Sequence, residues 1–209
     1  MTPINYREDI TQEGLNFAHD VCQAVADRDE LSELLSMYDV SDFTGGSGNR
    51  IVCEFPDEFI TAGGRYFDEQ HHDTFYVLKA CERPDLQNYK EVQIWKQAND
   101  GESADLFAPI HAWDGAYRWV LMKRVTPVTP YEGDTAYHPL LGSGQEHYYE
   151  PDAVEWIEEE LEKEGWEIVD VEENTAFHEE QEYLCLMDYG GVSPIDDEID
   201  LPKWVIHDT

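Results

Sequence analysis

A lysine inside an apolar stretch is the first residue of this chain that could do chemistry. Lys79 lies in the run Val-Leu-Lys-Ala, and Glu91 lies in the next predicted helix. Burying an unpaired ammonium group costs free energy, so a carboxylate such as Glu91 is an attractive partner for Lys79. The alternative is that Lys79 extends its ammonium group into solvent at the edge of a sheet.

Further groups that could bind charged ligands or metal ions lie before and after this pair. The glycine-rich run Gly45–Gly48 precedes a predicted strand, Asp170 is followed by Asn174, and Asp188 begins the triplet Asp-Tyr-Gly. Taken singly, each has a simpler explanation, because Asp, Asn and Gly are common in loop caps and turns. Their order along the chain is what makes them candidates for one site.

The elements that would position these residues are read from the spacing of apolar side chains. Gln12–Met37 and Leu86–Ala98 have the spacing of helices, and Pro151–Glu164 is a third predicted helix. Short strands are predicted at Trp166–Val171 and Tyr183–Met187. Five strands are predicted in the middle of the chain: Arg50–Phe55, Phe59–Ala62, Thr74–Cys81, Phe107–Trp113 and Tyr117–Val125. This order is an α+β pattern.

Acidic residues dominate the charge, with 47 Asp and Glu against 13 Lys and Arg and a formal net charge of -34. This charge excludes a basic nucleic-acid-binding surface and argues against docking on an anionic membrane. We interpret it as adaptation to a high-salt cytoplasm, such as that of haloarchaea or their viruses, because concentrated salt screens self-repulsion. The alternative is an acidic protein that binds a basic partner or mimics nucleic acid. Melting curves measured against KCl concentration distinguish the two.

Targeting and redox signals favour a cytoplasmic location. The chain has no apolar run of about 18 residues that could cross a membrane, and its first residues contain no apolar signal core. The cysteines are far apart and form no Cys-x-x-Cys pair, so we expect buried thiols in a reducing compartment. These cysteines are Cys22, Cys53, Cys81 and Cys185.

The motifs of several common enzyme classes are absent from the sequence. It contains no phosphate loop of the Gly-Lys type, no dinucleotide-binding glycine fingerprint, no nucleophile elbow and no His-Glu-x-x-His motif. The histidines and cysteines also lack the spacing of zinc ligands. The ordered set of residues around Lys79 is therefore the candidate that remains.

Together these features resemble the protein-kinase-like superfamily, which includes the small-molecule phosphotransferases related to aminoglycoside and choline kinases. The resemblance runs from about Gly45 to Gly191 and is closest to small, acidic, kinase-like proteins of haloarchaea and their viruses. It is strongest in Val77–Ala80 with Asn88–Trp95, and in the strand that enters Asp188. The resemblance implies an antiparallel five-stranded N-lobe with one interposed helix, followed by a very reduced C-terminal lobe.

On the phosphate side, the resemblance implies that the chain binds ATP. Gly46 and Gly48 would let backbone N–H groups approach the phosphates. Lys79 would hold the α- and β-phosphates, and Glu91 would hold Lys79 in place. Phosphoryl transfer needs positioning and charge neutralisation more than covalent work by the protein, and these groups suit that task.

On the metal and base side, the resemblance implies that Mg²⁺ binds with the nucleotide. Asn174 and Asp188 would be its ligands, and Asp170 would be the catalytic base that orients the acceptor hydroxyl. Met122 would lie in the inter-lobe hinge against which adenine packs. The acceptor would be a small molecule or a hydroxyl presented by a partner.

The resemblance also implies a division of the chain into three parts. Residues 1–44 would be an N-terminal helical extension, residues 45–125 the N-lobe, and residues 126–209 a reduced C-lobe with a loop insertion and an acidic tail. The expected function is nucleotide binding, with phosphotransfer as the activity if the protein is an enzyme. The alternatives are a non-catalytic kinase-like scaffold and an acidic interaction protein with a protein partner.

Overall fold

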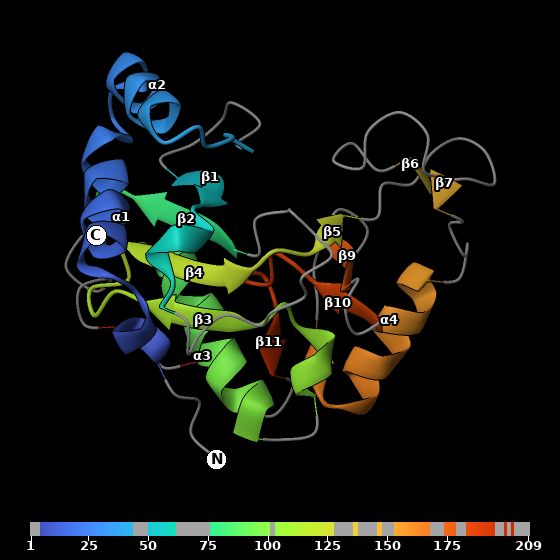
Figure 1. Ribbon diagram of the computed structural model, residues 1–209. Helices are drawn as coiled ribbons and strands as arrows, with labels where there is room; N and C mark the ends of the chain where they lie inside the picture. The colour runs from blue at the N-terminus through green and yellow to red at the C-terminus, as the bar shows by residue number, and fades with distance from the viewer. Residues whose placement is uncertain are drawn as a thin grey trace. The chain divides into compact units, whose positions relative to one another are not determined.

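The alternating sequence of Arg50–Phe55 forms β1, the first strand of an antiparallel sheet in the computed structural model of this chain. β1 pairs with β2 (Tyr76–Cys81), β2 with β4 (Trp119–Lys123), and β4 with β3 (Ile110–Trp113). The strand order is therefore β1-β2-β4-β3 (Figure 1). The structure describes residues 5–43, 50–61, 76–100, 103–127, 136–137, 146–147, 153–167, 174–178, 183–194, 199 and 202.

The predicted sheet contained one strand too many. Within the described residues the sheet has four strands, and Phe59–Ala62 contributes none of them. Asp57–Phe59 forms the 3-10 turn η2, and Ile60 forms only an isolated bridge with Ile10. The proline and aspartate that begin this stretch favour a turn over an extended strand. The mixed α+β class is confirmed, whereas the kinase-like N-lobe stays a prediction.

The predicted helix Gln12–Met37 is two helices, α1 (Gln12–Ala24) and α2 (Arg28–Met37). Asp27 separates them because its carboxylate caps the second helix. Oδ1 of Asp27 accepts hydrogen bonds from two backbone N–H groups in the first turn of α2, at 3.0 and 3.2 Å. A capping aspartate of this kind marks a helix start, which the apolar spacing alone did not reveal.

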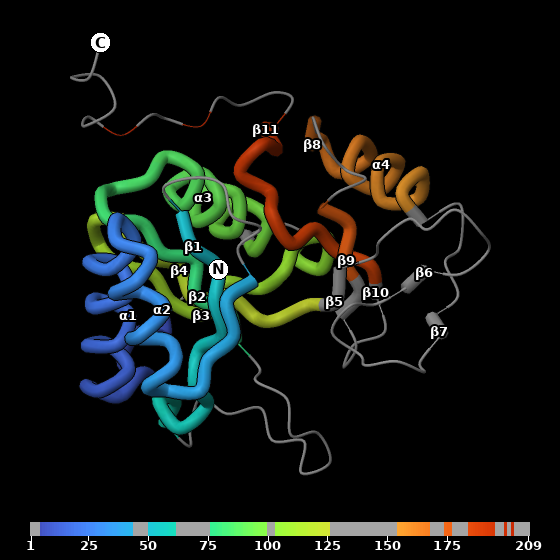
Figure 2. Tube along the Cα trace, turned by 90° about the horizontal axis from the view of Figure 1, so that it is seen from above, coloured from blue at the N-terminus to red at the C-terminus, as the bar shows by residue number. Residues whose placement is uncertain are grey.

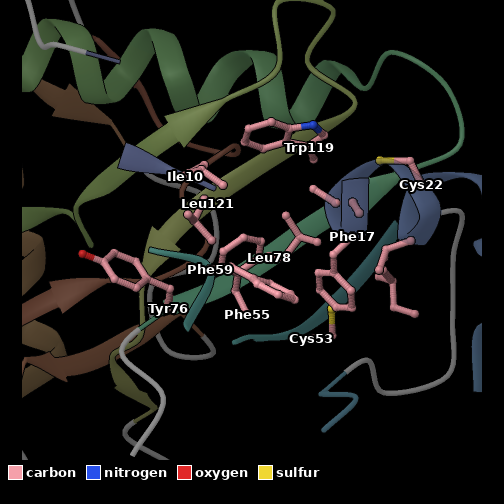
Figure 3. Close-up of a cluster of buried hydrophobic side chains, with 14 of the residues drawn as sticks. Ile10, Phe17, Cys22, Cys53, Phe55, Phe59, Tyr76, Leu78, Trp119 and Leu121 are labelled. Carbon is pink, nitrogen blue, oxygen red and sulfur yellow. The ribbon is translucent and has the colours of Figure 1, made fainter. Parts of the chain in front are cut away.

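One face of the sheet, which we call the core face, packs against α1 (Figure 3). Phe17 of α1 is fully buried there. Its ring centroid lies 4.9 Å from that of Tyr38, 5.9 Å from that of Phe55 and 5.7 Å from that of Phe59. By strand register, the core face carries Ile51, Cys53, Phe55, Tyr76, Leu78, Ala80, Trp119 and Leu121.

The chain divides into two compact units. The sheet unit comprises Ile4–Asn88 and Ile110–Arg124 and contains α1, α2 and strands β1 to β4. The hairpin unit comprises Met1–Pro3, Tyr89–Pro109 and Val125–Thr209. Within the sheet unit α1 shares the core of the sheet, so the N-terminal helix packs on this chain's own strands. The predicted boundaries after residues 44 and 125 stay predictions.

The hairpin unit is built around a small three-stranded sheet with the order β10-β9-β5. Strands β9 and β10 lie side by side in it (Figure 2). The predicted helix Pro151–Glu164 is confirmed as α4, and the predicted strand Tyr183–Met187 is confirmed as β10. The elements with residues in this unit are α3 (Leu86–Asp100), η3 (Ala104–Leu106), β5 (Thr126–Pro127), β6 (Ala136–Tyr137), β7 (Glu146–His147), α4 (Ala153–Lys163), β8 (Trp166–Glu167), β9 (Thr175–His178), β10 (Tyr183–Leu186) and β11 (Ser193–Pro194). None of the helices that the structure describes is long and apolar enough to cross a membrane.

All four cysteines are free and buried, as expected. Burial raises the pKa of the Cys22 thiol to about 11 and the pKa of the Cys81 and Cys185 thiols to about 12. A thiol must lose its proton to act as a nucleophile, so these three cysteines are unsuited to covalent catalysis.

Position 14 of α1 requires a glycine because the helix packs closely against neighbouring side chains of the sheet unit there. A Cβ atom on Gly14 would lie 2.6 Å from Cβ of Phe59, 2.9 Å from Cγ2 of Ile10 and 3.1 Å from Cζ of Phe55. In an open helix Gly→Ala stabilises by about 1 kcal/mol. At Gly14 we expect Gly14→Ala to destabilise by about 1–2 kcal/mol instead, because overpacking costs about 1–3 kcal/mol.

Chemical denaturation at constant KCl concentration measures this effect. Asn16→Ala is the matched control, because Asn16 lies on the exposed side of the same helix. It should stabilise by about 0.5 kcal/mol through helix propensity alone. If Gly14→Ala stabilised by the same amount as the control, the close packing at Gly14 would be contradicted.

Candidate functional site

Lys79 lies on the sheet face opposite to the core face. It pairs in register with Val52 of β1 and Val120 of β4, and Val77 pairs with Met122. Alternation places these side chains on one side, which we call the lysine face: Val52, Glu54, Val77, Lys79, Val120 and Met122. These residues combine one ammonium group and one carboxylate with four apolar side chains.

Lys79 is buried, with only 4% of its surface exposed. Its strand has a neighbour on both sides, so the alternative of a lysine that reaches solvent at a sheet edge is wrong. Val120 and Met122 are also buried, whereas Val52 and Val77 are half-buried. Lysine is rarely buried to this extent, which makes Lys79 a candidate functional group.

The predicted phosphate-binding glycines, Gly46 and Gly48, lie outside the described residues. The chain before them, Ser41–Phe43, pairs with β1 after them. The backbone N–H of Phe43 donates to the carbonyl oxygen of Val52 at 2.8 Å, and an equivalent bond joins β1 to Ser41 at 3.0 Å. In sequence, the glycine-rich run therefore lies between two segments, Ser41–Phe43 and β1, that pair with each other at the outer edge of the sheet. Strand β2 separates β1 from β4.

In the hairpin unit, the pairing of β9 with β10 brings Asn174 close to Asp188. Thr175 is the register partner of Leu186, and the backbone N–H of Met187 donates to the carbonyl oxygen of Asn174 at 2.9 Å. Asp188 is the next residue, and both Asn174 and Asp188 are half-buried. The backbone at Asn174 therefore lies beside Met187, the residue that precedes Asp188, at one end of this strand pair.

Tyr189 anchors the loop that follows β10. It is completely buried, its ring centroid lies 4.9 Å from that of Phe107, and its hydroxyl donates to the carbonyl oxygen of Ala108 at 2.9 Å. Burial raises the pKa of Tyr189 well above its ordinary range, and the negative charges of Glu91 and Asp188 raise it further. Tyr189 therefore stays a neutral donor, and Glu91 and Asp188 lie near it in the same unit.

Asn174 and Asp188 offer the hard oxygen ligands that Mg²⁺ prefers. Among the residues that the structure describes, no three or more His, Cys, Asp or Glu side chains gather closely enough to hold a metal ion. Mg²⁺ needs no such cage, because it commonly binds one or two carboxylates and completes its octahedron with water and phosphate oxygens. The assignment of Asn174 and Asp188 as Mg²⁺ ligands stays a prediction.

The predicted site residues fall in both compact units. Lys79 and Met122 belong to the sheet unit and share the lysine face, whereas Glu91, Asn174 and Asp188 belong to the hairpin unit. The pairing of Lys79 with Glu91 stays a prediction. Three predicted residues lie outside the described part of the chain: Gly46, Gly48 and Asp170.

An ion pair on the lysine face was missed by sequence reasoning. Oε1 of Glu54 accepts a hydrogen bond from Nη1 of Arg124 at 3.2 Å, and its Oε2 accepts one from the backbone N–H of Ser41 at 3.0 Å. The guanidinium carbon of Arg124 lies 5.3 Å from the ring centroid of Phe43. The signal was the alternation within Arg50–Phe55, which places Glu54 on the side opposite to the core residues.

No protein-family model, curated protein or solved structure matches this chain. The case for a function therefore depends on these residues, their burial and their geometry.

Proposed function

We propose that the chain binds ATP together with Mg²⁺ and that Lys79 of the lysine face holds the phosphates. The observation that carries the proposal is the position of Lys79, which is buried on an inner strand, on the sheet face opposite to the one that packs against α1. Lysine is a compact positive charge that commonly binds phosphate. We infer that this ammonium group binds the phosphates of an anionic ligand.

The apolar part of the lysine face is suited to a base. Ligand sites are mostly apolar, with few polar groups that fix orientation. Val77 and Met122 pair across β2 and β4, and Lys79 is two residues further along β2, a distance of about 7 Å. We therefore assign the phosphates to Lys79 and the base to the end of the face where the half-buried Val77 pairs with Met122.

Asn174 and Asp188 are the metal-binding residues of this proposal. Mg²⁺ would neutralise part of the phosphate charge, and this matters for a chain with a net charge of -34 that repels an anion such as ATP. Salt screens the same repulsion. We accordingly propose that binding occurs in a salt-rich cytoplasm and is strongest at high ionic strength.

Transfer of the terminal phosphoryl group to a small or partner-presented hydroxyl is the reaction that we propose for the bound nucleotide. Asp170 is the base that orients the hydroxyl in this proposal. A non-catalytic scaffold is the alternative, and it binds ATP without consuming it. Turnover assays with small hydroxyl compounds distinguish the two, because only the enzyme releases ADP in proportion to acceptor.

Isothermal titration of the full chain with ATP in molar KCl, with and without Mg²⁺, tests the proposal. We expect Mg²⁺ to raise the affinity for ATP. Asp188→Asn should reduce this gain in affinity by about 10-fold, because an interaction with a charged group contributes about 1.5–3 kcal/mol to binding. The matched control is Glu158→Gln, an exposed carboxylate on α4 of the same unit, which should leave the gain unchanged. An absence of heat with Mg-ATP would contradict the proposed function.

A further inference from the structure

We propose that Glu54 and Arg124 are positioning residues, which together form the end of the lysine face where the base lies. This inference rests on the proposed function, because it concerns the base of the nucleotide that the lysine face would bind. It adds residues that neither the sequence pattern nor the predicted site included.

The register places this ion pair at one end of the lysine face. Glu54 of β1 is the partner of Val77 in β2, and Val77 is the partner of Met122 in β4. Arg124 comes two residues after Met122. Since Oε1 of Glu54 lies 3.2 Å from Nη1 of Arg124, the pair links β1 to the end of β4 across the intervening strand β2. The link closes the end of the face that Val77 and Met122 occupy.

Other contacts hold the pair in one geometry. Oε2 of Glu54 is occupied by the backbone N–H of Ser41, and the guanidinium of Arg124 lies over the ring of Phe43. The side chains of Glu54 and Arg124 are only 16% and 18% exposed. A partly buried pair is screened by salt much less than an exposed one, so we expect this contact to persist in molar KCl.

The position of the pair separates its effect from that of Lys79. Lys79 is about 7 Å further along β2 than Val77, so phosphates at Lys79 lie away from the pair, whereas a base on Val77 and Met122 lies beside it. Loss of the pair should therefore weaken the binding of the base and leave the binding of the phosphates unchanged. A general loss of structure in the sheet would weaken both.

The test titrates the full chain in molar KCl with three probes: Mg-ATP, adenosine, and magnesium tripolyphosphate, which has no base. For Glu54→Gln, which keeps the shape of the side chain and removes its charge, we expect a loss of about 5- to 10-fold for Mg-ATP and adenosine. The affinity for magnesium tripolyphosphate should not change. Arg124→Gln is the second variant, and it should give the same pattern.

Asp114→Asn is the matched control. It breaks the 3.0 Å ion pair between Asp114 and Arg118 in the loop between β3 and β4, within the same unit, and should change the affinity for none of the three probes. Equal losses for all three probes in Glu54→Gln and Arg124→Gln, or no loss for adenosine, would overturn the inference while leaving the proposed function standing. Failure of the unsubstituted chain to bind Mg-ATP would instead overturn the proposed function, and this inference with it.

Discussion

Replacing Lys79 with methionine is expected to weaken the binding of Mg-ATP by about 100-fold. Methionine is similarly long and flexible, so it fills the space on the lysine face without offering a charge to the phosphates. A hydrogen bond to a charged group contributes about 1.5–3 kcal/mol, and the upper part of that range corresponds to about 100-fold in affinity. Isothermal titration in molar KCl measures the loss, and Lys79→Arg should retain part of the affinity because it keeps the charge.

The matched control for Lys79→Met is Lys123→Met. Lys123 is also a buried lysine of this sheet, but its register partner is Tyr76 of the core face. We expect Lys123→Met to leave the affinity for Mg-ATP unchanged. Lys79→Met should also lower the affinity for magnesium tripolyphosphate and spare adenosine, which is the reverse of the pattern expected for Glu54→Gln. Equal losses in the two lysine variants would contradict the assignment of phosphates to Lys79.

Phe17→Ala is expected to destabilise the sheet unit by about 3–5 kcal/mol. The ring of Phe17 is fully buried and lies against three other aromatic rings: Tyr38 at the C-terminal end of α2, Phe55 of β1 and Phe59 of η2. Alanine leaves a cavity among these rings in addition to the lost apolar burial. Urea denaturation at constant KCl concentration, followed by tryptophan fluorescence, measures the change in the free energy of unfolding.

Phe17→Leu is the control for this prediction, because it keeps most of the apolar volume. We expect it to cost less than about 1.5 kcal/mol. A loss below about 1 kcal/mol for Phe17→Ala would show that α1 does not pack into the core face as the structure has it. That outcome would also remove the basis for separating the core face from the lysine face.

Much of the secondary structure could be predicted because it depends on local periodicity. β1, β2, α3, α4 and β10 form close to where apolar spacing placed them. The short strands β5, β6, β7, β9 and β11 were not predicted. Two further errors arose where a short polar signal outweighed that spacing. Asp27 caps α2 and divides the predicted N-terminal helix, and the turn at Asp57 replaces a predicted strand.

The residues of the candidate site were named from the sequence, and their assembly into one site stays a prediction. The apolar run around Lys79 already indicated a buried lysine, and the Asp-Tyr-Gly triplet already marked Asp188 as a candidate ligand. The approach of Asn174 to Asp188 depends on the register of β9 with β10, and no local pattern encodes that register. The partner of Glu54, Arg124, lies 70 residues away in sequence, and no local pattern indicates such a contact.

Local side-chain pattern was sufficient to identify the elements, the acidity and the isolated lysine, since each depends on residues within a few positions of one another. The strand order that gives Lys79 two neighbours, and the span from Glu54 to Arg124, became known only from the folded chain. Both depend on contacts between residues that are far apart in sequence. Such contacts form only when the whole sheet is assembled on its core, so short-range pattern carries no record of them.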